Sequence, residues 1–543
     1  MAGGESGKDR GLYAVLWDPY RNRGYDSCVA TALDETFTAL PLRALADAAL
    51  SRALALGSSH ADFRLEKVRR SQLGLRDAHA SGAVDTTDSG FAVRVVRDGA
   101  WGFASGADLT PEAAARVAER AVEMARLAAS VRHAGAGGTD GGRGPVELAE
   151  EPSHGEREWV SPYVTDPFEV PDGEKAALLA RWSRRLLSEP GITHVDAGVR
   201  AVRECKFYAD TAGTVTTQQR VRIQPLLTAV ALGGAGGFET MRTLAPPTAR
   251  GWEYLAGASP GTGWDWEAEL ERMPELLEEK LRAPTVEPGA YDLVVDPSNL
   301  WLTLHESVGH ATELDRALGH EAAYAGTSFA TPDRLGTLRY GAEAMHVTGD
   351  RTAPHALATT GYDDEGVAAQ SWDLVRDGVL VGYQLDRRTA RLAGDGRSNG
   401  CAFADSPSHA PMQRMANVSL APAPGGPSTE ELIGGVERGI YVVGDRSWSI
   451  DQQRFNFQFT AQRFFRIEHG RLAGQLRDVA YQATTTEFWG SLEAVGGPGT
   501  YVTGGSFVCG KGQPGQLAAV SHGCPSALFR RVNILNTARE AGR

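Results

Sequence analysis

The segment that most constrains the fold of this chain is residues 305–315, where the sequence HESVGHATELD brings together two histidines and three carboxylates. It follows a short β-rich run at 291–295, after which Asp296 can cap a helix and Pro297 suits the first helical turn, where no amide hydrogen is needed. Apolar residues then recur every four positions, at Leu300, Leu304 and Val308. The pattern predicts a strand leading into a helix that carries the histidines and turns an apolar stripe toward the core.

The spacing of His305 and His310 predicts a local distortion of this helix if both side chains bind one ion. In the common HExxH motif the histidines are four positions apart, ~40° around the helix axis. Here they are five positions apart, which places them roughly 140° apart on an ideal helix. A single π-type turn would reduce this angle to roughly 50°, and Gly309, a weak helix former, is its expected place. Spacing alone leaves open a regular helix with one buried and one solvated histidine.

Length, charge and cysteine content predict a soluble cytoplasmic protein of at least two domains. A chain of 543 residues is too long for one ordinary core. The net charge of −13 argues against nucleic acid and against polybasic membrane binding, because both need clustered lysines and arginines. No apolar run approaches a membrane span, and the N-terminus lacks a signal pattern. Five dispersed cysteines fit a reducing compartment better than a disulfide framework.

The order of the expected elements indicates an α+β protein, with an N-terminal α/β domain followed by a mostly β C-terminal domain that carries the metal-binding helix. The predicted parts are a polar extension, either ordered arm or mobile tail, at 1–34, the N-terminal domain at 35–286 and the C-terminal domain at 287–543. A glycine-rich segment at 133–155 is expected to be a flexible surface excursion. Tight hairpins are predicted at Asp98-Gly99, Asp377-Gly378 and His469-Gly470.

Two clusters in the C-terminal half are candidates for structure or for substrate contact. The sequence GYDDEG at 361–366 sets three acids between glycines, where a turn is favoured over a calcium-like loop or a binding-site wall. The segment 408–417, SHAPMQRMAN, places His409 and Arg414 beside a proline. These two side chains are candidate substrate contacts, although a single loop histidine is more often an ordinary surface residue.

Two further clusters contain candidate metal-binding thiols. In GGSFVCGKG at 504–512, Cys509 stands in a glycine frame where the backbone can approach a metal or ligand closely. His522 and Cys524, in the sequence HGC, form a second candidate pair of nitrogen and sulfur donors.

Taken in chain order, these motifs resemble the TldD/PmbA family of metallopeptidases. The resemblance is close from about Tyr291 to Gly512 and looser over 61–129, and it points to the TldD branch, because the PmbA branch lacks the His-Glu-His motif. The motifs that carry it are HESVGHATELD, GYDDEG, DRRTARL, SHAPMQRMAN, ERGIYV and CGKG. The chain departs from the family pattern after Cys509, in the region ending VSHGCP, and in its longer N-terminal extension.

The resemblance implies a catalytic zinc site, with Glu306 as the catalytic carboxylate. The implied metal ligands are His305, His310 and Cys509. Two imidazoles and a thiolate leave a fourth position for water, as catalytic zinc requires. Zinc would acidify that water and polarise a peptide carbonyl, while Glu306 takes the proton and returns it to the leaving amine. Glu313 and Asp315 are candidates to orient the histidines, or are solvated helix charges.

The resemblance also implies a dimer enclosing a cavity for small or unfolded peptides, held as an added strand. The chain would pair with itself or with a PmbA-like subunit that lacks the metal site. The leading hypothesis is therefore a zinc-dependent peptidase of short or unfolded peptides. The first alternative is a metal-dependent hydrolase of an amide or related bond in a natural-product pathway, consistent with the departures noted above. The second is a non-catalytic binding subunit.

Overall fold

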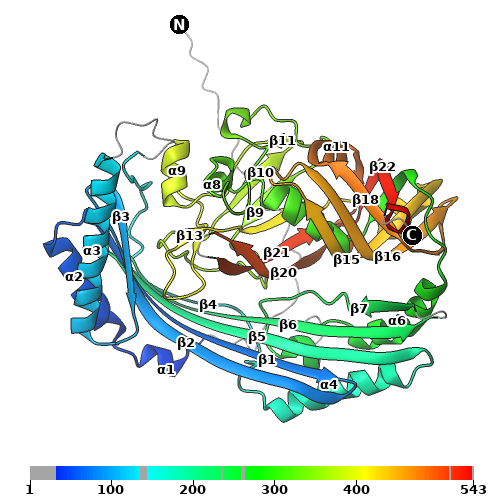
Figure 1. Cartoon of the computed structure of the whole chain (residues 1–543), viewed down its shortest axis with the longest axis horizontal. Coiled ribbons are helices and arrows are strands. Elements are labelled where there is room, and N and C mark those ends of the chain that lie inside the picture. The colour runs from blue at the N-terminus through cyan, green and yellow to red at the C-terminus, as the bar shows by residue number, and fades with distance from the viewer. Residues whose placement is uncertain are drawn as a thin grey trace, which may run out of the picture.

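A long, curved sheet from the N-terminal half forms the base on which the C-terminal half rests (Figure 1). The computed structural model describes residues 32–134, 144–233, 237–257, 263–394, 396–512 and 515–540. The strands of this base sheet are, in spatial order, β3 (Ala100–Gly106), β2 (His79–Arg97), β1 (His60–Arg76), β5 (Ile192–Asp210), β6 (Val215–Leu232) and β4 (Glu156–Val160), with β7 (Phe238–Arg242) also paired to β6. Only β4 is parallel to its neighbour among these described strands.

Helices cover the base sheet in two separate hydrophobic clusters. The helices of this half are α1 (Glu35–Thr38), α2 (Leu42–Ala55), α3 (Pro111–Ala134), α4 (Asp172–Leu187), α5 (Glu253–Ala256) and α6 (Trp266–Arg282). Helices α2 and α3 pack on one end of β1 and β2, whereas α4 and α6 pack on β5 and β6. The hairpin predicted at Asp98-Gly99 is confirmed, because both residues have positive φ between β2 and β3.

A closed sheet forms the core of the C-terminal half and holds the helix that carries the histidines. Its ring of strands is β15 (Arg438–Ile450), β8 (Gly289–Val295), β22 (Ala527–Asn536), β18 (Val479–Thr484) and β16 (Asn456–Glu468), which pairs back to β15, with β17 (Arg471–Leu476) and β19 (Leu492–Val495) attached. Helix α7 (Pro297–Leu304) follows β8, and the Asn299 amide donates to the carbonyls of Gly444 and Thr460. The Tyr481 hydroxyl donates to Asn299 Oδ1, so three strands of the ring hold this helix.

Shorter elements complete the C-terminal half. A small sheet has the order β11 (Val379–Leu380), β10 (Ser371–Arg376), β9 (Val347–Asp350) and β14 (Asn417–Leu420), and two hairpins are β12 (Ala402–Phe403) with β13 (Met412–Gln413) and β20 (Val502–Lys511) with β21 (Gln516–Cys524). The short helices are α8 (Leu314–Ala317), α9 (Arg387–Ala393), α10 (Thr429–Gly434), α11 (Thr485–Gly490) and α12 (Thr537–Glu540). The hairpins predicted at Asp377-Gly378 and His469-Gly470 are confirmed. The predicted α+β class is therefore observed.

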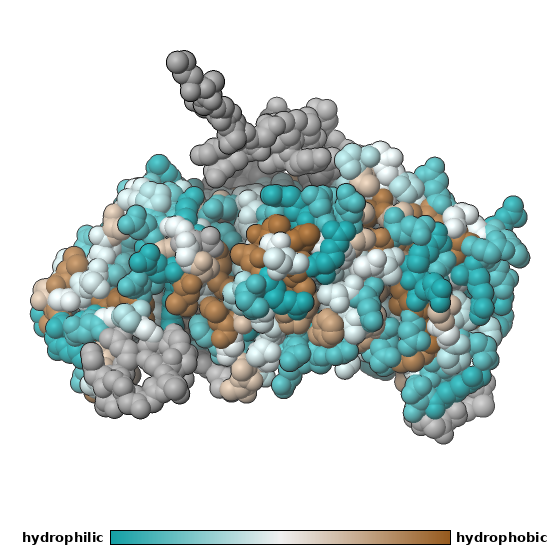
Figure 2. Space-filling model, turned by 90° about the horizontal axis from the view of Figure 1, so that it is seen from above, coloured by the Kyte–Doolittle hydropathy of each residue, from teal (hydrophilic) through white to brown (hydrophobic). Residues whose placement is uncertain are grey.

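The outer surface is mixed in polarity. Seen from above, the molecule is mostly hydrophilic, with hydrophobic residues in separate patches between hydrophilic ones (Figure 2). None of the helices in the described part of the chain combines the length and the hydrophobicity needed to cross a bilayer.

Buried ion pairs join the base sheet to the GYDDEG segment of the C-terminal half. Lys206 of β5 donates to Asp364 Oδ2 at 2.6 Å. Arg94 of β2 contacts Asp62 Oδ2 at 2.8 Å and Glu365 Oε1 at 2.7 Å. The segment is a turn, as favoured from its sequence, but its three acids are buried rather than solvated. Because these acids face lysine, arginine and backbone donors, the turn fixes the C-terminal half on the sheet and does not resemble a calcium loop.

The described part of the glycine-rich segment at 133–155 lies at the surface, as expected, and has backbone partners in both halves. Residues 135–143 lie outside the described residues, as do 1–31 of the predicted extension. The remainder is fastened to its surroundings: the Val146 amide donates to the Gly99 carbonyl, and Ala149 exchanges hydrogen bonds with Arg387 of α9. Ala149 is buried, whereas most of residues 144–155 are exposed, so this part lies at the surface and forms a strap that contacts both halves. Its composition gave no sign of these backbone partners.

The Arg94 ion pairs give a test of the connection between the two halves. We expect Arg94→Ala to lower the free energy of unfolding by about 3–5 kcal/mol, because it leaves the Asp62 and Glu365 carboxylates buried without their guanidinium. Urea unfolding followed by tryptophan fluorescence measures this change. The matched control is Arg69→Ala, which removes a half-exposed pair with Asp85 on the same sheet and should cost below about 1 kcal/mol. Equal effects of the two substitutions would contradict the assigned importance of the buried pairs.

Candidate metal centre

The two histidines are brought together by a π turn that continues α7. Asp296 caps α7 by accepting from the Ser298 amide at 2.9 Å, and Pro297 occupies the first turn, as predicted. The π turn spans His305–Gly309, and the His310 amide donates to the His305 carbonyl at 3.0 Å. This hydrogen bond joins residues five positions apart, as in a π-helix. The π turn predicted at Gly309 is therefore confirmed.

Side chains stabilise the carbonyl groups that the π turn takes out of the regular helical pattern. Gln384 Nε2 donates to the Gly309 carbonyl at 2.6 Å, and the Tyr340 hydroxyl donates to the Ser307 carbonyl. A Cβ atom at Gly309 would lie 2.6 Å from the Met415 sulfur, so only a glycine lets the Met415 side chain pack this closely against the turn. The turn is therefore fixed by packing and hydrogen bonds from distant segments, and not only by local helix propensity.

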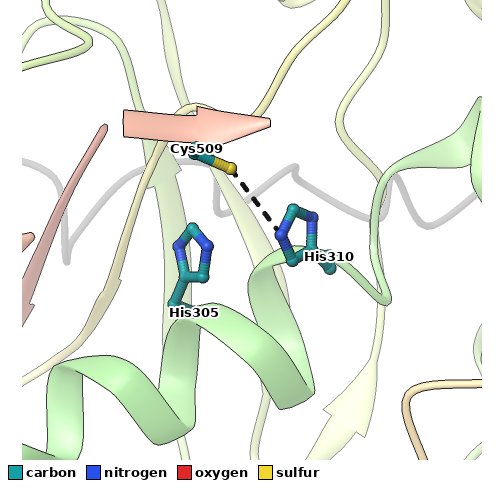
Figure 3. Close-up of side chains that lie close together, drawn as sticks. All are labelled: His305, His310 and Cys509. Carbon is teal, nitrogen blue, oxygen red and sulfur yellow. Dashed lines mark hydrogen bonds between the residues drawn. The ribbon is translucent and has the colours of Figure 1, made fainter. Parts of the chain in front are cut away.

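The third donor comes from the β20–β21 hairpin. Cys509 lies on β20 opposite Ala518 of β21, and its sulfur is 3.7 Å from His310 Nε2. The side chains of His305, His310 and Cys509 point into one small space between the helix and the strand (Figure 3). One ligand atom from each lies within 4.8 Å of the others, and no other group of this kind is found among the described residues. Donors of a tetrahedral zinc site lie about 3.3–3.6 Å apart, so the 3.7 Å separation of Cys509 and His310 is close to that of two ligands of one ion.

A carboxylate orients one of the two imidazoles. His310 Nδ1 lies 2.9 Å from Glu313 Oε2, and because an ionised carboxylate only accepts, this nitrogen carries the proton. The Nε2 lone pair of His310 therefore faces Cys509. Glu313 itself accepts from Arg316 Nε at 3.1 Å and from Lys511 Nζ at 3.1 Å. Burial acts to raise the pKa of Glu313, but Lys511, His310 and Arg316 hold it well below its usual range.

Both predicted orienting acids are buried, so the alternative of solvated helix charges is wrong. Glu313 is fully buried and contacts a candidate ligand directly. Asp315 instead accepts from Lys511 Nζ at 2.8 Å, and the same ammonium also donates to the Gln413 side chain. Asp315 is therefore linked to His310 through Lys511 and then Glu313. Sequence reasoning did not single out Lys511, although it stands in the CGKG motif.

Glu306 is buried next to His305 and is held by an arginine from another turn. Arg454 Nη1 donates to Glu306 Oε2 at 2.8 Å, and Arg454 Nη2 donates to the Ala325 carbonyl at 3.1 Å. Arg454 has a φ of 63° in the turn between β15 and β16, a conformation that is uncommon outside glycine. Its sequence context carries no recognisable signal, and sequence reasoning missed it.

The protonation states favoured by the surroundings suit metal binding. Burial lowers the pKa of both His305 and His310, which favours the neutral imidazole. Burial acts to raise the pKa of the Cys509 thiol, but a protonated His310 ring and then the Arg414 guanidinium outweigh it, so this pKa lies below its ordinary value. For Cys524 no such groups compensate, and burial raises its pKa. Cys509 is therefore the better thiolate of the two.

The remaining predicted site residues lie around the hairpin and the base sheet. Arg414 is buried and donates to the carbonyls of Cys509 and Gln516, so its contacts hold the β20–β21 hairpin. His409 Nδ1 contacts Asp405 at 2.7 Å, and its carbonyl accepts from Arg64 of the base sheet. Substrate contact stays a prediction for both. Cys524 is not part of the compact donor group, and His522 contacts His305 without joining it.

The fold and the site together define a two-part α+β protein with a candidate metal centre of two histidines and a cysteine, and comparisons with known proteins give its family. The model for the PmbA/TldA metallopeptidase C-terminal domain matches residues 288–536, and the model for domain 1 of the same family matches 61–125. This chain belongs to the TldD/PmbA metallopeptidase family.

Individual relatives agree with this assignment. A metalloprotease of Methanothermobacter thermautotrophicus is 28% identical over 495 residues, which cover 88% of this chain and 96% of that protein. A zinc metalloprotease TldD homolog of Saccharolobus solfataricus is 24% identical over 49% of this chain and 56% of its own length. Among solved structures, TldE from Thermococcus kodakarensis has a TM-score of 0.64 at 18% identity and covers 89% of this chain and 98% of its own. This last likeness shows the fold.

Proposed function

We propose that this protein is a zinc-dependent peptidase that hydrolyses short or unfolded peptides. The observation that carries the proposal is the convergence of His305, His310 and Cys509 in one buried space, with the carboxylate of Glu306 one residue from the first ligand. Membership of a metallopeptidase family and the zinc named in one relative support the choice of reaction and metal.

The donor set fits zinc better than magnesium or calcium. Two neutral imidazoles and one thiolate are ligands that zinc accepts, whereas magnesium and calcium prefer oxygen. Three protein ligands are the usual number when a position is left for water or substrate. Zinc held there would act as a Lewis acid that acidifies water and polarises a peptide carbonyl.

Glu306 supplies the proton transfer in this proposal. Its carboxylate would accept a proton from the attacking water and return that proton to the leaving amine nitrogen. Arg454 holds one oxygen, Oε2, which leaves the other carboxylate oxygen for this work. Arg454 thus fixes the orientation of the Glu306 carboxylate. Because this carboxylate is buried, leaving it without a partner would destabilise the protein.

The setting of the enzyme is part of the same proposal. The four cysteines among the described residues are free, which supports a reducing compartment such as the cytoplasm. We propose a dimer, with a second copy or with a PmbA-like subunit, because the family resemblance implies one. Hydrolysis of peptide libraries and of small amides, measured side by side, separates the peptidase from a natural-product amide hydrolase. A protein that holds essentially no zinc after purification without chelator would favour a non-catalytic binding subunit.

The assignment of Glu306 as base predicts a separation of metal binding from turnover. We expect Glu306→Gln to keep zinc and to lower kcat for peptide hydrolysis by about 10²–10⁴-fold, because the amide cannot accept the proton. Zinc content by atomic emission and kcat on an active peptide are measured on the same preparation. Glu493→Gln, which alters a surface pair with Arg530, is the control and should change neither quantity. Loss of zinc with unchanged kcat would refute the assigned role.

The choice of thiol gives a second prediction. We expect Cys509→Ala to weaken zinc binding by more than about 100-fold. Loss of a metal ligand lowers metal affinity more than loss of a residue that only hydrogen-bonds to a ligand. Cys524→Ala should leave zinc affinity unchanged, because this buried cysteine on the paired strand is outside the donor group. Competition with a chromophoric chelator measures both affinities. The reverse outcome would show that the wrong cysteine has been assigned.

A further inference from the structure

His522 lies directly behind His305, in a position that the zinc-binding motif does not explain. It belongs to β21, is fully buried, and its Nε2 lies 2.7 Å from His305 Nδ1. Its other ring nitrogen, Nδ1, lies 2.8 Å from the Val418 carbonyl of β14. The Trp301 ring stacks on it with an interplanar angle of 11°. Both nitrogens and one face of this ring are therefore occupied by fixed partners.

The hydrogen bonds determine which nitrogens carry protons. A carbonyl oxygen only accepts, so the proton of a neutral His522 ring is on Nδ1 and points at Val418. Its Nε2 is then an acceptor, and the short contact requires His305 Nδ1 to donate. A neutral His305 with its proton on Nδ1 has its lone pair on Nε2. This leaves Nε2 as the nitrogen available to an ion shared with His310 and Cys509.

We propose that His522 is a positioning residue that fixes the tautomer and ring orientation of His305 for metal binding. The backbone carbonyl of Val418 sets the proton on His522, and His522 sets the proton on His305. This inference rests on the proposed zinc site. It also excludes His522 as a ligand in this arrangement, because neither of its nitrogens is free, and so replaces the pairing with Cys524 considered from the sequence.

The use of an imidazole here has an electrostatic reason. His310 is oriented by the carboxylate of Glu313, which is the more common partner for a metal-binding histidine. A carboxylate behind His305 would be one more buried negative charge, and the nearby cations Arg454 and Lys511 are already paired with Glu306 and Glu313. A neutral ring accepts the same hydrogen bond without that charge.

The test compares two substitutions that differ in the hydrogen-bond acceptor. His522→Leu keeps an apolar side chain in the pocket but removes the acceptor, and we expect zinc affinity to fall about 10–100-fold. His522→Gln offers an amide oxygen to His305 Nδ1, and we expect it to recover most of the lost affinity. Affinities are measured by competition with a chromophoric chelator, and Cys524→Ala on the same strand serves as the packing control. Equal zinc affinity of the wild type and the leucine variant would overturn the proposal, as would equal losses in the leucine and glutamine variants.

A second measurement uses the wild-type protein and therefore does not depend on the folding of a variant. Long-range proton–nitrogen NMR correlations of histidine-labelled, zinc-free wild-type protein report the tautomer of each ring, and both His305 and His522 should carry the proton on Nδ1. A proton on Nε2 of His522 would overturn the assignment. If the wild type binds no zinc in the competition assay, the proposed function fails instead, and the tautomer result still decides the hydrogen-bond chain.

Discussion

The π turn at His305–Gly309 is the constraint on which the rest of this site depends. A regular helix would turn the two histidines to different sides, whereas the bond from the His310 amide to the His305 carbonyl brings them to one side. Such a turn is less favourable than regular helix, so it needs support from outside. Gln384 and Tyr340 provide this support by capping the displaced carbonyls, and Gly309 leaves space for Met415.

The buried charges form two groups with different tasks. One group, between the base sheet and the GYDDEG turn, attaches the C-terminal half through Arg94 and Lys206. The other lies behind the candidate metal centre, where Lys511 and Arg316 pair with the carboxylates of Glu313 and Asp315. Buried ion pairs contribute little net stability, but each removes alternative arrangements because an unpaired partner is costly. The positions of the candidate ligands are thus specified by polar contacts as well as by hydrophobic packing.

Local sequence predicted the local structure of this protein well. The cap at Asp296, the π turn at Gly309 and the hairpins at glycine-containing turns depend on neighbouring residues, and all were recovered. The side chains and backbone groups that distant segments contribute to the site were not predicted. Arg454 beside Glu306 and the strap at 144–155 depend on tertiary contacts that leave no periodic or compositional signal. Cys509 was placed next to the histidines only through family resemblance, since about two hundred residues separate them.

We infer that one ion is held by two imidazoles and one sulfur. Zinc K-edge X-ray absorption of the purified protein tests this coordination directly. We expect a shell of nitrogen or oxygen neighbours at about 2.0–2.1 Å together with a single sulfur at about 2.3 Å. A zinc environment without sulfur, or one with several sulfurs, would contradict it.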